Sequence, residues 1–310
     1  MSFFTELLYG FPSRKAKFIF LTGPEGKTTV AKLTQHILSH LNINSSLYQK
    51  KYNLTKFVSH QLRQNIKYII SEYPFKTKNS ITVNINLNTP PEKLAKKIKI
   101  SPTQLSFDYK NYHFITDSPF YYLINTIIAA FEICLKLNIK PEDFIKNIQY
   151  FPEILGQREE ISNNFKFKTF LDSAQTPLAI NAILTSLDKL PHNKLIVIFG
   201  YSSLRDNSLR KKIGEILSKF ADKIYFTSDD MVKEPIEKIA ADVFGDNNNK
   251  KLTIVSNRQD AFNEAIKTAT TDDIIIALGR GRRNYLIQNN TRFPWSEAEA
   301  FRTAFRIRNQ

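Results

Sequence analysis

Residues 17–29 read KFIFLTGPEGKTT, a short apolar run followed by a turn with two glycines and then a helical pattern. This order predicts a strand over Lys17–Thr22, a phosphate-binding loop over Thr22–Thr29 and a helix that continues to about Leu41. Such a loop aims backbone N–H groups and the positive end of the helix dipole at one point, where phosphate oxygens can bind. A plain strand-to-helix turn that happens to contain Gly-Lys-Thr is the alternative.

Five residues of this loop are candidates for binding ATP. Gly23 and Gly26 supply backbone conformations that a Cβ atom would hinder. Lys27 is expected to reach the β- and γ-phosphates, and the hydroxyl group of Thr28 is expected to coordinate Mg²⁺. Thr29 completes the predicted set of nucleotide contacts. The loop therefore predicts ATP and Mg²⁺ as cofactors.

Two other residues of the loop favour weak or absent ATP binding. Pro24 has no N–H group to donate to a phosphate. Glu25 brings a negative charge toward the position that a triphosphate would occupy. A loop that keeps its shape but has lost nucleotide binding is therefore a second interpretation of the same residues.

The composition is that of a folded globular protein with an unusual charge. The chain has 310 residues, of which 42% are hydrophobic, and its 44 Lys and Arg less 29 Asp and Glu leave a net charge of +15. This charge suits an anionic partner such as a nucleotide, an acidic substrate, a nucleic acid or a membrane surface. Lysines between Lys50 and Lys110 are interpreted mainly as a solvated surface, since no nucleic-acid-binding motif accompanies them.

The compartment is predicted from what the sequence lacks. Cys134 is the single cysteine, so no disulfide can form within the chain and a reducing cytoplasm is expected. No basic segment precedes the apolar residues near the N-terminus, unlike in a signal peptide. The longest apolar run, Pro119–Leu137, contains Asn125, Glu132 and Lys136, which favours a buried helix over a membrane span.

Strand-like and helical patterns alternate along the chain, which is typical of an α/β protein with largely parallel sheets. In the first half, further strands are predicted at Tyr68–Ser71 and Ile81–Leu87, a hairpin at Gln104–Thr116, and helices from Pro119 and Pro141. The second half predicts five strands with crossovers: Lys166–Leu171, Lys194–Phe199, Lys223–Phe226, Leu252–Val255 and Asp273–Leu278. A change of periodicity near Glu153–Ser162 divides the chain into domains at 1–155 and 156–310.

Ordered motifs through the whole chain resemble those of the Mur ligase family, most closely its UDP-N-acetylmuramyl-tripeptide synthetase branch. The lead-in Tyr9–Lys15 is similar to the approach to that family's phosphate loop, whose usual form is T-G-T-N-G-K-T-[TS]. Leu155–Glu159 resembles P-G-R-x-E, with Gln157 at the place of the arginine and Arg158 one position later. Asp172–Pro177 resembles D-Y-A-H-T-P, with Gln175 in place of the histidine.

The remaining motifs follow in the order of the family. The segment from Phe199 to Glu215, which contains Arg205, resembles F-G-x-G-G-D-R-D-x-x-K-R. Thr227–Asp230 resembles T-S-D-N, and Leu278–Arg282 resembles A-G-K-G-H. After the second glycine of this late loop, Arg282 and Arg283 replace polar residues and are expected either to bind an anion or to face solvent.

The resemblance implies a fold, an activity and a set of site residues. It implies a central ATP-binding domain with a phosphate loop at 1–155 and a Rossmann-like C-terminal domain at 156–310. It also implies ATP-dependent amide bond formation in cell-wall (peptidoglycan) precursor synthesis, through an acyl phosphate that an amino acid attacks. The implied catalytic residues are Lys27 and Arg158, the further nucleotide contacts are Asn125, Asp172 and Arg205, and the metal ligands are Thr28 and Glu72.

Several departures from the family pattern keep a second class of function open. The family's Asp-His pair and its carbamylated lysine have no clear counterpart, because Lys96 and Lys97 read as ordinary exposed lysines. The family's N-terminal UDP-binding domain is expected to be missing, so a protein partner could supply it. The expected partners are a nucleotide and an acidic peptide or UDP-linked precursor, with nucleic acid unlikely. The alternative is a pseudo-ligase that keeps the fold as a structural or regulatory subunit.

Overall fold

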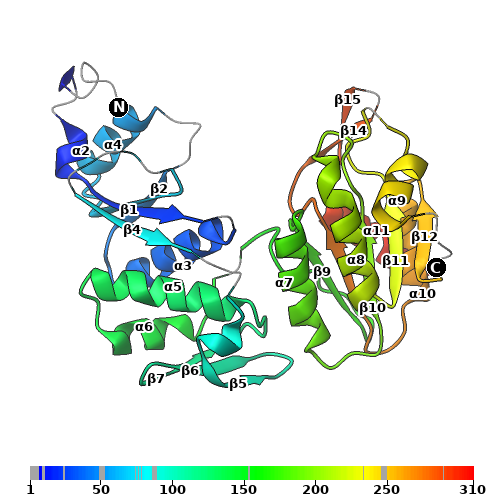
Figure 1. Cartoon of the computed structure of the whole chain (residues 1–310), viewed down its shortest axis with the longest axis horizontal. Coiled ribbons are helices and arrows are strands. Elements are labelled where there is room, and N and C mark those ends of the chain that lie inside the picture. Colours follow the sequence, from blue (N-terminus) through cyan, green and yellow to red (C-terminus); the bar gives the residue numbers. More distant parts are fainter. Residues whose placement is uncertain are drawn as a thin grey trace. The chain divides into compact units, whose positions relative to one another are not determined.

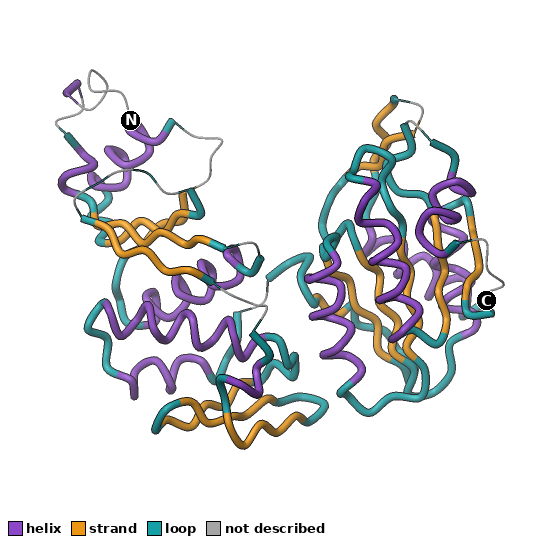
Figure 2. The backbone as a smooth tube through the Cα atoms, viewed as in Figure 1, coloured by secondary structure: helices purple, strands orange, loops and turns teal. Residues whose placement is uncertain are grey.

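The computed structural model describes the chain except for residues 1–6, 9–10, 24, 49–52, 74, 76, 78, 86–88, 153, 233, 246–249 and 289. It divides into two compact units, Met1–Pro152 and Glu153–Gln310. Each unit combines helices with a largely parallel sheet (Figures 1 and 2). Among the described residues, no helix is both long enough and apolar enough to cross a lipid bilayer.

A four-stranded parallel sheet forms the centre of unit 1. Its strands are β1 (Lys17–Thr22), β2 (Ser45–Tyr48), β3 (Tyr68–Ser71) and β4 (Ser80–Asn84), in the order β2-β3-β1-β4. The central position of β1 explains its continuous apolar sequence, because four successive residues, Phe18 to Leu21, are buried. Helix α3 (Lys27–His40) connects β1 to β2, and α4 (Leu54–Arg63) connects β2 to β3. The short helix α2 (Pro12–Lys15) precedes β1.

Two further helices cover α3. Helix α5 (Leu123–Lys136) packs against α3, and α6 (Pro141–Ile148) contacts both. The apolar run is therefore a buried helix, as predicted, but the predicted start at Pro119 is wrong. The N–H groups of Leu123 and Ile124 donate to the carbonyls of Phe120 and Tyr121, three residues back, so a tight turn precedes the helix. Helix α6 does begin at Pro141.

An antiparallel sheet of β5 (Lys96–Ile100), β6 (Leu105–Tyr109) and β7 (Tyr112–Thr116) completes unit 1, after the short 3₁₀ helix η1 (Pro91–Lys93). The predicted hairpin is confirmed, whereas β5 and β2 were not expected. Aromatic rings join this sheet to the helices: Phe114 lies 5.1 Å from Phe131, and Phe131 lies 5.2 Å from Phe144, between ring centroids.

Unit 2 is a six-stranded sheet in the order β12-β11-β10-β13-β9-β8 with helices on both faces (Figure 1). Helices α7 and α8 lie on the near face of the sheet, and α10 and α11 lie behind it. The strands are β8 (Glu159–Glu160), β9 (Lys168–Asp172), β10 (Leu195–Phe199), β11 (Lys223–Thr227), β12 (Leu252–Val255) and β13 (Ile274–Leu278). The helices are α7 (Pro177–Asp188), η2 (Asn207–Leu209), α8 (Arg210–Phe220), α9 (Ile236–Phe244), α10 (Arg258–Thr268) and α11 (Glu297–Arg308).

The five predicted strands of unit 2 are all present, but the count was incomplete. The two-residue strand β8 pairs antiparallel with β9 at the edge of the sheet, with Glu159 opposite Leu171. A two-residue acidic strand has no periodicity that could reveal it in the sequence. The hairpin of β14 (Tyr285–Gln288) and β15 (Thr291–Pro294) was also not predicted.

Candidate functional site

The loop between β1 and α3 has a backbone that requires glycine. Gly23 has φ +120° and Gly26 has φ +82°, both in the left-handed region. A Cβ atom on Gly23 would lie 2.2 Å from the carbonyl oxygen of Ile85. Gly26 caps α3 without any side-chain hydrogen bond, and the start of a helix is the place where backbone N–H groups can bind an anion. Pro24 lies outside the described residues.

The side chain of Lys27 folds back over this loop. Its ammonium nitrogen donates to the carbonyl oxygen of Gly23 at 2.5 Å. The same nitrogen is thus held above the glycine turn, on the side of the helix N-terminus. A lysine in this position can place a point charge against phosphate oxygens. Thr29, in the same turn of the helix, is buried in the face that α3 turns to the core.

A carboxylate from the neighbouring strand meets the loop at Thr28. The hydroxyl group of Thr28 donates to Oε1 of Glu72 at 2.7 Å, although 44 residues separate them in sequence. The reason is the parallel pairing of β1 with β3, which brings the carboxyl ends of both strands to one edge of the sheet. The two predicted metal ligands are therefore neighbours, and both offer the oxygen atoms that Mg²⁺ binds.

Asn125 lies in the buried face of α5. Its amide nitrogen donates to the backbone carbonyl of Thr89 at 2.8 Å, and only 6% of the residue is exposed. Contact with an adenine through this nitrogen would require the bond to Thr89 to open. The predicted role of Asn125 stays a prediction.

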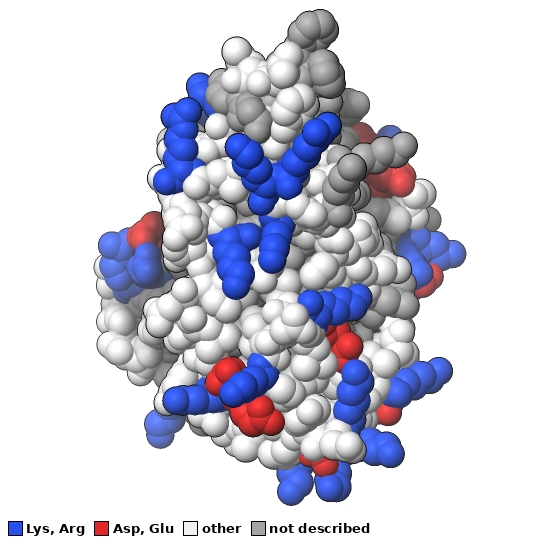
Figure 3. Space-filling view, turned by 90° about the vertical axis from the view of Figure 1, so that its left-hand side faces the viewer, with Lys and Arg blue, Asp and Glu red and all other residues white. Residues whose placement is uncertain are grey.

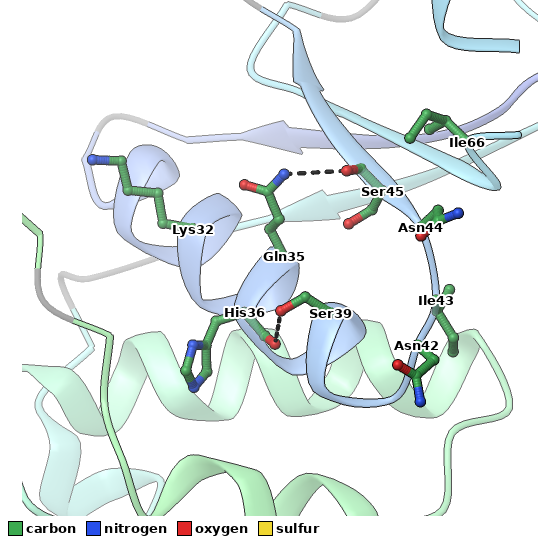
Figure 4. Close-up of a pocket in the computed structure, with 9 residues that line it drawn as sticks. All are labelled: Lys32, Gln35, His36, Ser39, Asn42, Ile43, Asn44, Ser45 and Ile66. Carbon is green, nitrogen blue, oxygen red and sulfur yellow. Dashed lines mark hydrogen bonds between the residues drawn. The ribbon is translucent and has the colours of Figure 1, made fainter. Parts of the chain in front are cut away.

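A pocket of about 450 Å³ lies beside α3, away from the glycine turn (Figure 4). Gln35 donates to the carbonyl of Ser45 at 3.2 Å, and Ser39 donates to the carbonyl of His36 at 2.8 Å. Burial, followed by the nearby His40, lowers the pKa of His36. The pocket is lined by Lys32 and by no Asp or Glu. The bond of Gln35 joins α3 to β2, the bond of Ser39 lies within α3, and neither extends to the phosphate loop.

Three loops meet at the carboxyl end of β9 in unit 2. The N–H of Ser173 donates to the carbonyl of Gly156 at 2.9 Å, and the N–H of Gly279 donates to the carbonyl of Asp172 at 2.9 Å. The side chain of Gln175 donates to the carbonyl of Gly279. The segments around residues 156, 172 and 279, which were singled out separately in the sequence, are therefore one local structure.

The carboxyl group of Asp172 is buried and accepts hydrogen bonds from two backbone N–H groups. Its oxygens accept from the N–H of Arg158 and the N–H of Ala174, each at 2.7 Å. Burial raises the pKa of Asp172 to about 6, and the two backbone hydrogen bonds oppose this rise. Arg158 has φ +45° and is 8% exposed. The structure thus brings Arg158 and Asp172 together through the backbone of Arg158.

The late loop directs its arginines to carboxylates of the chain. Arg282 donates from Nε to Oε2 of Glu159 at 2.8 Å, and Glu159 also accepts from the N–H of Gly156 at 2.7 Å. Arg283 donates to Asp230 at 2.7 Å. Both arginines are thus paired within the chain rather than simply facing solvent. No local sequence pattern indicates these partners.

A buried charge network lies near the carboxyl ends of β11 and β13. Arg280 donates to Asp229, to Asp230 at 3.1 Å and to the carbonyl of Tyr285. Asp229 and Asp230 are 0% and 4% exposed, so they need these cationic partners. Asp229 and Arg280 each lie in a motif that the sequence shows, but nothing in either motif predicts that the two side chains bind each other.

Arg205 lies beside this network, and its guanidinium group has donors that make no hydrogen bond with the described chain. Its Nη2 lies 3.6 Å from Oδ2 of Asp229, and burial lowers the pKa of the guanidinium group. Both Nη atoms are buried and make no hydrogen bond with the described part of the chain. Together with Arg280 and Arg283, Arg205 gives three positive charges against the two of Asp229 and Asp230. Arg205 is therefore the residue of unit 2 that is best placed to bind an anionic group.

Comparison with known proteins agrees with the motifs. Residues 157–281 match the model of the Mur ligase, glutamate ligase domain. The UDP-N-acetylmuramoyl-L-alanyl-D-glutamate--2,6-diaminopimelate ligase of Prochlorococcus marinus is 26% identical to this chain, over 90% of the chain and 75% of the relative. The ligase of that name from Rickettsia rickettsii is also 26% identical, over 91% of the chain but only 61% of the relative.

The fold is shared with solved structures. The crystal structure of MurF ligase from Thermotoga maritima in complex with ADP superimposes with a TM-score of 0.68 at 12% identity, over 98% of this chain and 84% of that one. The predicted fold class is thereby confirmed: a P-loop ATPase-like domain followed by a Rossmann-like C-terminal domain of Mur ligase type.

Proposed function

We propose that this chain is a member of the Mur ligase family, because residues 157–281 match a Mur ligase domain and 90% of the chain is similar to a Mur ligase, and that it is an ATP-dependent ligase that joins a carboxylate substrate to the amine of an amino acid. The carboxylate would first take the γ-phosphoryl group of ATP, and the amine would then displace phosphate from the acyl phosphate. An acidic peptide or UDP-linked precursor of the cell wall, made in the cytoplasm, is the proposed carboxylate substrate.

The observation that carries this proposal is the arrangement of Lys27, Thr28 and Glu72 at one edge of the unit 1 sheet. Phosphoryl transfer needs little covalent chemistry from the protein, so positioning and charge neutralisation are its main contributions. The N–H groups after Gly26 would bind phosphate oxygens, and Lys27 would leave the carbonyl of Gly23 to neutralise the transferred group.

The donor set at Thr28 and Glu72 fits Mg²⁺, since a hydroxyl and a carboxylate supply oxygen ligands and the nucleotide and water supply the rest. When bound, Mg²⁺ neutralises phosphate charge and polarises the transferred phosphoryl group. Thr28 would then exchange its hydrogen bond to Glu72 for a contact with the ion. Glu72 would hold the ion on the side of β3.

Unit 2 has an anion-binding candidate of its own. We propose that Arg205 binds an anionic group of the nucleotide or the substrate, because its two Nη atoms are buried without hydrogen-bond partners in the described chain. Asp172 and Arg158 would hold the loops at the carboxyl end of β9 in shape rather than exchange protons, since the carboxyl group of Asp172 already accepts two backbone hydrogen bonds.

The test is a titration of Mg·ATP against the wild-type chain, Lys27→Ala and the matched control Lys32→Ala, which removes a lysine from the same helix outside the loop. We expect Lys27→Ala to weaken ATP binding by at least about tenfold, the loss of one strong charge-assisted contact, and Lys32→Ala to leave it within about twofold. Phosphate release is then measured with a panel of amino acids and UDP-linked carboxylate precursors. Absence of ATP binding by the wild type contradicts the proposed activity.

A catalytically impaired pseudo-ligase is the second candidate function. Among the described residues, no group of three or more His, Cys, Asp and Glu side chains could hold a metal ion, and Glu25 adds a negative charge to the phosphate loop. Both features favour weakened phosphoryl transfer. ATP binding that Lys27→Ala abolishes, without phosphate release under any of these conditions, would favour this candidate.

A further inference from the structure

The positive charge of the chain is concentrated in unit 1. In Met1–Pro152, 20 Lys and Arg less 9 Asp and Glu leave +11, whereas in Glu153–Gln310, 24 less 20 leave +4. The phosphate loop accounts for little of this excess, because Lys27 is its only cation and Glu25 lies beside it. Most of the charge of unit 1 therefore serves some other purpose or merely coats the surface.

One face of unit 1 carries cations without carboxylates (Figure 3). Blue side chains gather on the upper central part of this face with no red directly beside them, while red and blue are mixed below and at both edges of the view. In the antiparallel sheet and the helix beside it, cations are paired with carboxylates: Lys97 with Asp108, and Lys110 with Glu132. Charge is thus neutralised in one part of unit 1 and left unbalanced in another.

A pocket of about 280 Å³ opens at the amino ends of the unit 1 strands. Lys17 begins β1, and Lys136 lies in the last turn of α5; both line the pocket and both are exposed. Lys67 is next to it, with Nζ 5.6 Å from the ring centroid of the lining residue Tyr68. No Asp or Glu lines the pocket, and the remaining polar lining is Asn79, Ser80 and Asn138.

More cations surround the pocket through α2. Asn79, which lines it, donates from its side chain to the carbonyl of Arg14 at 2.7 Å, so the end of α2 lies at its rim. Arg14 and Lys15 are exposed, like Lys17, Lys67 and Lys136. None of these five makes an ion pair with a described Asp or Glu. We call the pocket and these five cations the basic pocket.

The basic pocket is separate from the phosphate loop. β1 runs from Lys17 at the pocket to Thr22 at the loop, and five steps of about 3.3 Å place these residues roughly 17 Å apart at opposite ends of the strand. Its aromatic lining does not suit nucleobases, since Phe18 is 1% and Tyr68 7% exposed and neither offers a free face for stacking. Ammonium, amide and hydroxyl donors without aromatic platforms favour a phosphate group itself.

We propose that the basic pocket binds a phosphate- or diphosphate-bearing anion at a site distinct from the phosphate loop. Lys17 and Lys136 would contact the phosphate oxygens, Asn79 and Asn138 would donate to oxygens that the lysines leave free, and Arg14, Lys15 and Lys67 would attract the anion. The phosphate can belong to a soluble ester or to a lipid headgroup, since the pocket would bind the same phosphate oxygens in both.

The test uses the full chain and inorganic pyrophosphate as the probe, titrated calorimetrically without Mg²⁺. All variants carry Lys27→Ala, which removes the lysine of the phosphate loop. We expect this background to retain pyrophosphate binding, and the added pair Lys17→Gln and Lys136→Gln to weaken it by at least about tenfold through loss of two charge-assisted contacts. The control pair Lys99→Gln and Lys146→Gln removes the same charge from exposed sites elsewhere in unit 1 and should change affinity by less than about threefold.

The outcomes decide the proposal independently of the ligase activity. Equal losses in the pocket pair and the control pair would overturn it, because the effect would then be one of net charge, and so would loss of all pyrophosphate binding on Lys27→Ala alone. Binding of a single-stranded oligonucleotide with no affinity for pyrophosphate would also overturn it. If pyrophosphate binds, co-sedimentation with phosphatidic acid vesicles that the pocket pair abolishes assigns the phosphate to a lipid headgroup, and no co-sedimentation assigns it to a soluble ester.

Discussion

The carboxyl ends of the two parallel sheets treat charge in opposite ways. In unit 1 the end of β1 presents a glycine turn, the start of helix α3 and one lysine that bonds to a backbone carbonyl. In unit 2 the corresponding edge is filled by the chain's own ions, with Arg280 between Asp229 and Asp230 and Arg282 against Glu159. The sheet edge of unit 1 around Gly23–Thr28 is thus left for a ligand, and we call it the open edge. The corresponding edge of unit 2 is occupied by internal ion pairs of Asp229, Asp230 and Glu159, and we call it the filled edge.

The difference follows from what each edge must satisfy. Backbone N–H groups at a helix start can bond to water, so the folded protein loses little stability when no anion is bound. Buried carboxylates have no such alternative, because an unpaired charge inside a protein is strongly destabilising. Asp229 and Asp230 therefore require arginines in the folded chain whether or not a ligand binds, whereas both Nη atoms of Arg205 are buried without a hydrogen-bond partner in the described chain.

The largest effect is expected from breaking the filled edge. Arg280→Met would leave Asp229 and Asp230 buried without their main cation, so we expect the free energy of unfolding of unit 2 to fall by about 3–5 kcal/mol. Chemical denaturation followed by circular dichroism measures this change. Arg302→Met is the control, because Arg302 pairs with Glu299 at the surface with 51% of its side chain exposed and should cost less than about 1 kcal/mol. Similar losses in both variants would contradict the network's role.

A somewhat smaller effect is expected from pH at Asp172. Burial raises the pKa of its carboxyl group from 3.8 to about 6, so between these values the folded chain binds more protons than the unfolded one. The contribution of Asp172 to stability is therefore present below about pH 4 and is lost as pH rises to about 6, by up to about 3 kcal/mol.

Asp172→Asn removes this titration and isolates it from that of other carboxylates. We expect the difference in unfolding free energy between the wild type and Asp172→Asn to change in favour of the variant from pH 4 to pH 7. Urea unfolding at four pH values in this range measures it. A difference that is constant with pH, or that changes in favour of the wild type, would show that the folded pKa of Asp172 is not raised.

The sequence predicted the open edge far better than the filled one. The strand, the glycine turn and the helix from Lys17 to His40 are signalled by neighbouring residues: buried apolar positions, two glycines with positive φ, and a helical period. Glu72 was singled out by the resemblance to Mur ligases, at the end of a recognisable strand, and the structure places it beside Thr28; its binding of a metal ion stays a prediction. The filled edge depends on partners far apart in the chain, such as Arg282 and Glu159 at a separation of 123 residues, and no local pattern encodes such pairs.

The misplaced start of α5 has a similar explanation. A proline suits the first turn of a helix, so the sequence predicts that α5 starts at Pro119. Instead, the N–H groups of Leu123 and Ile124 bond to carbonyls three residues back, which forms a tight turn ahead of the helix. Local preference identified a helix in this run, but the packing of the chain determined where it starts.

The smallest expected effect on stability tests whether the open edge is built for a metal ion. Glu72→Gln keeps an oxygen that can accept from the hydroxyl group of Thr28, so the free energy of unfolding should fall by no more than about 1 kcal/mol. The amide is a poor substitute for a carboxylate toward Mg²⁺, because it brings no negative charge. We therefore expect ATP affinity measured with Mg²⁺ to fall clearly in this variant, while affinity measured in EDTA stays unchanged. Glu142→Gln, at an exposed position in the first turn of α6, should change neither affinity. If Glu72→Gln instead lost several kcal/mol of stability and kept its Mg²⁺ dependence, Glu72 would be a structural partner of Thr28, and the two edges would differ less than their geometry indicates.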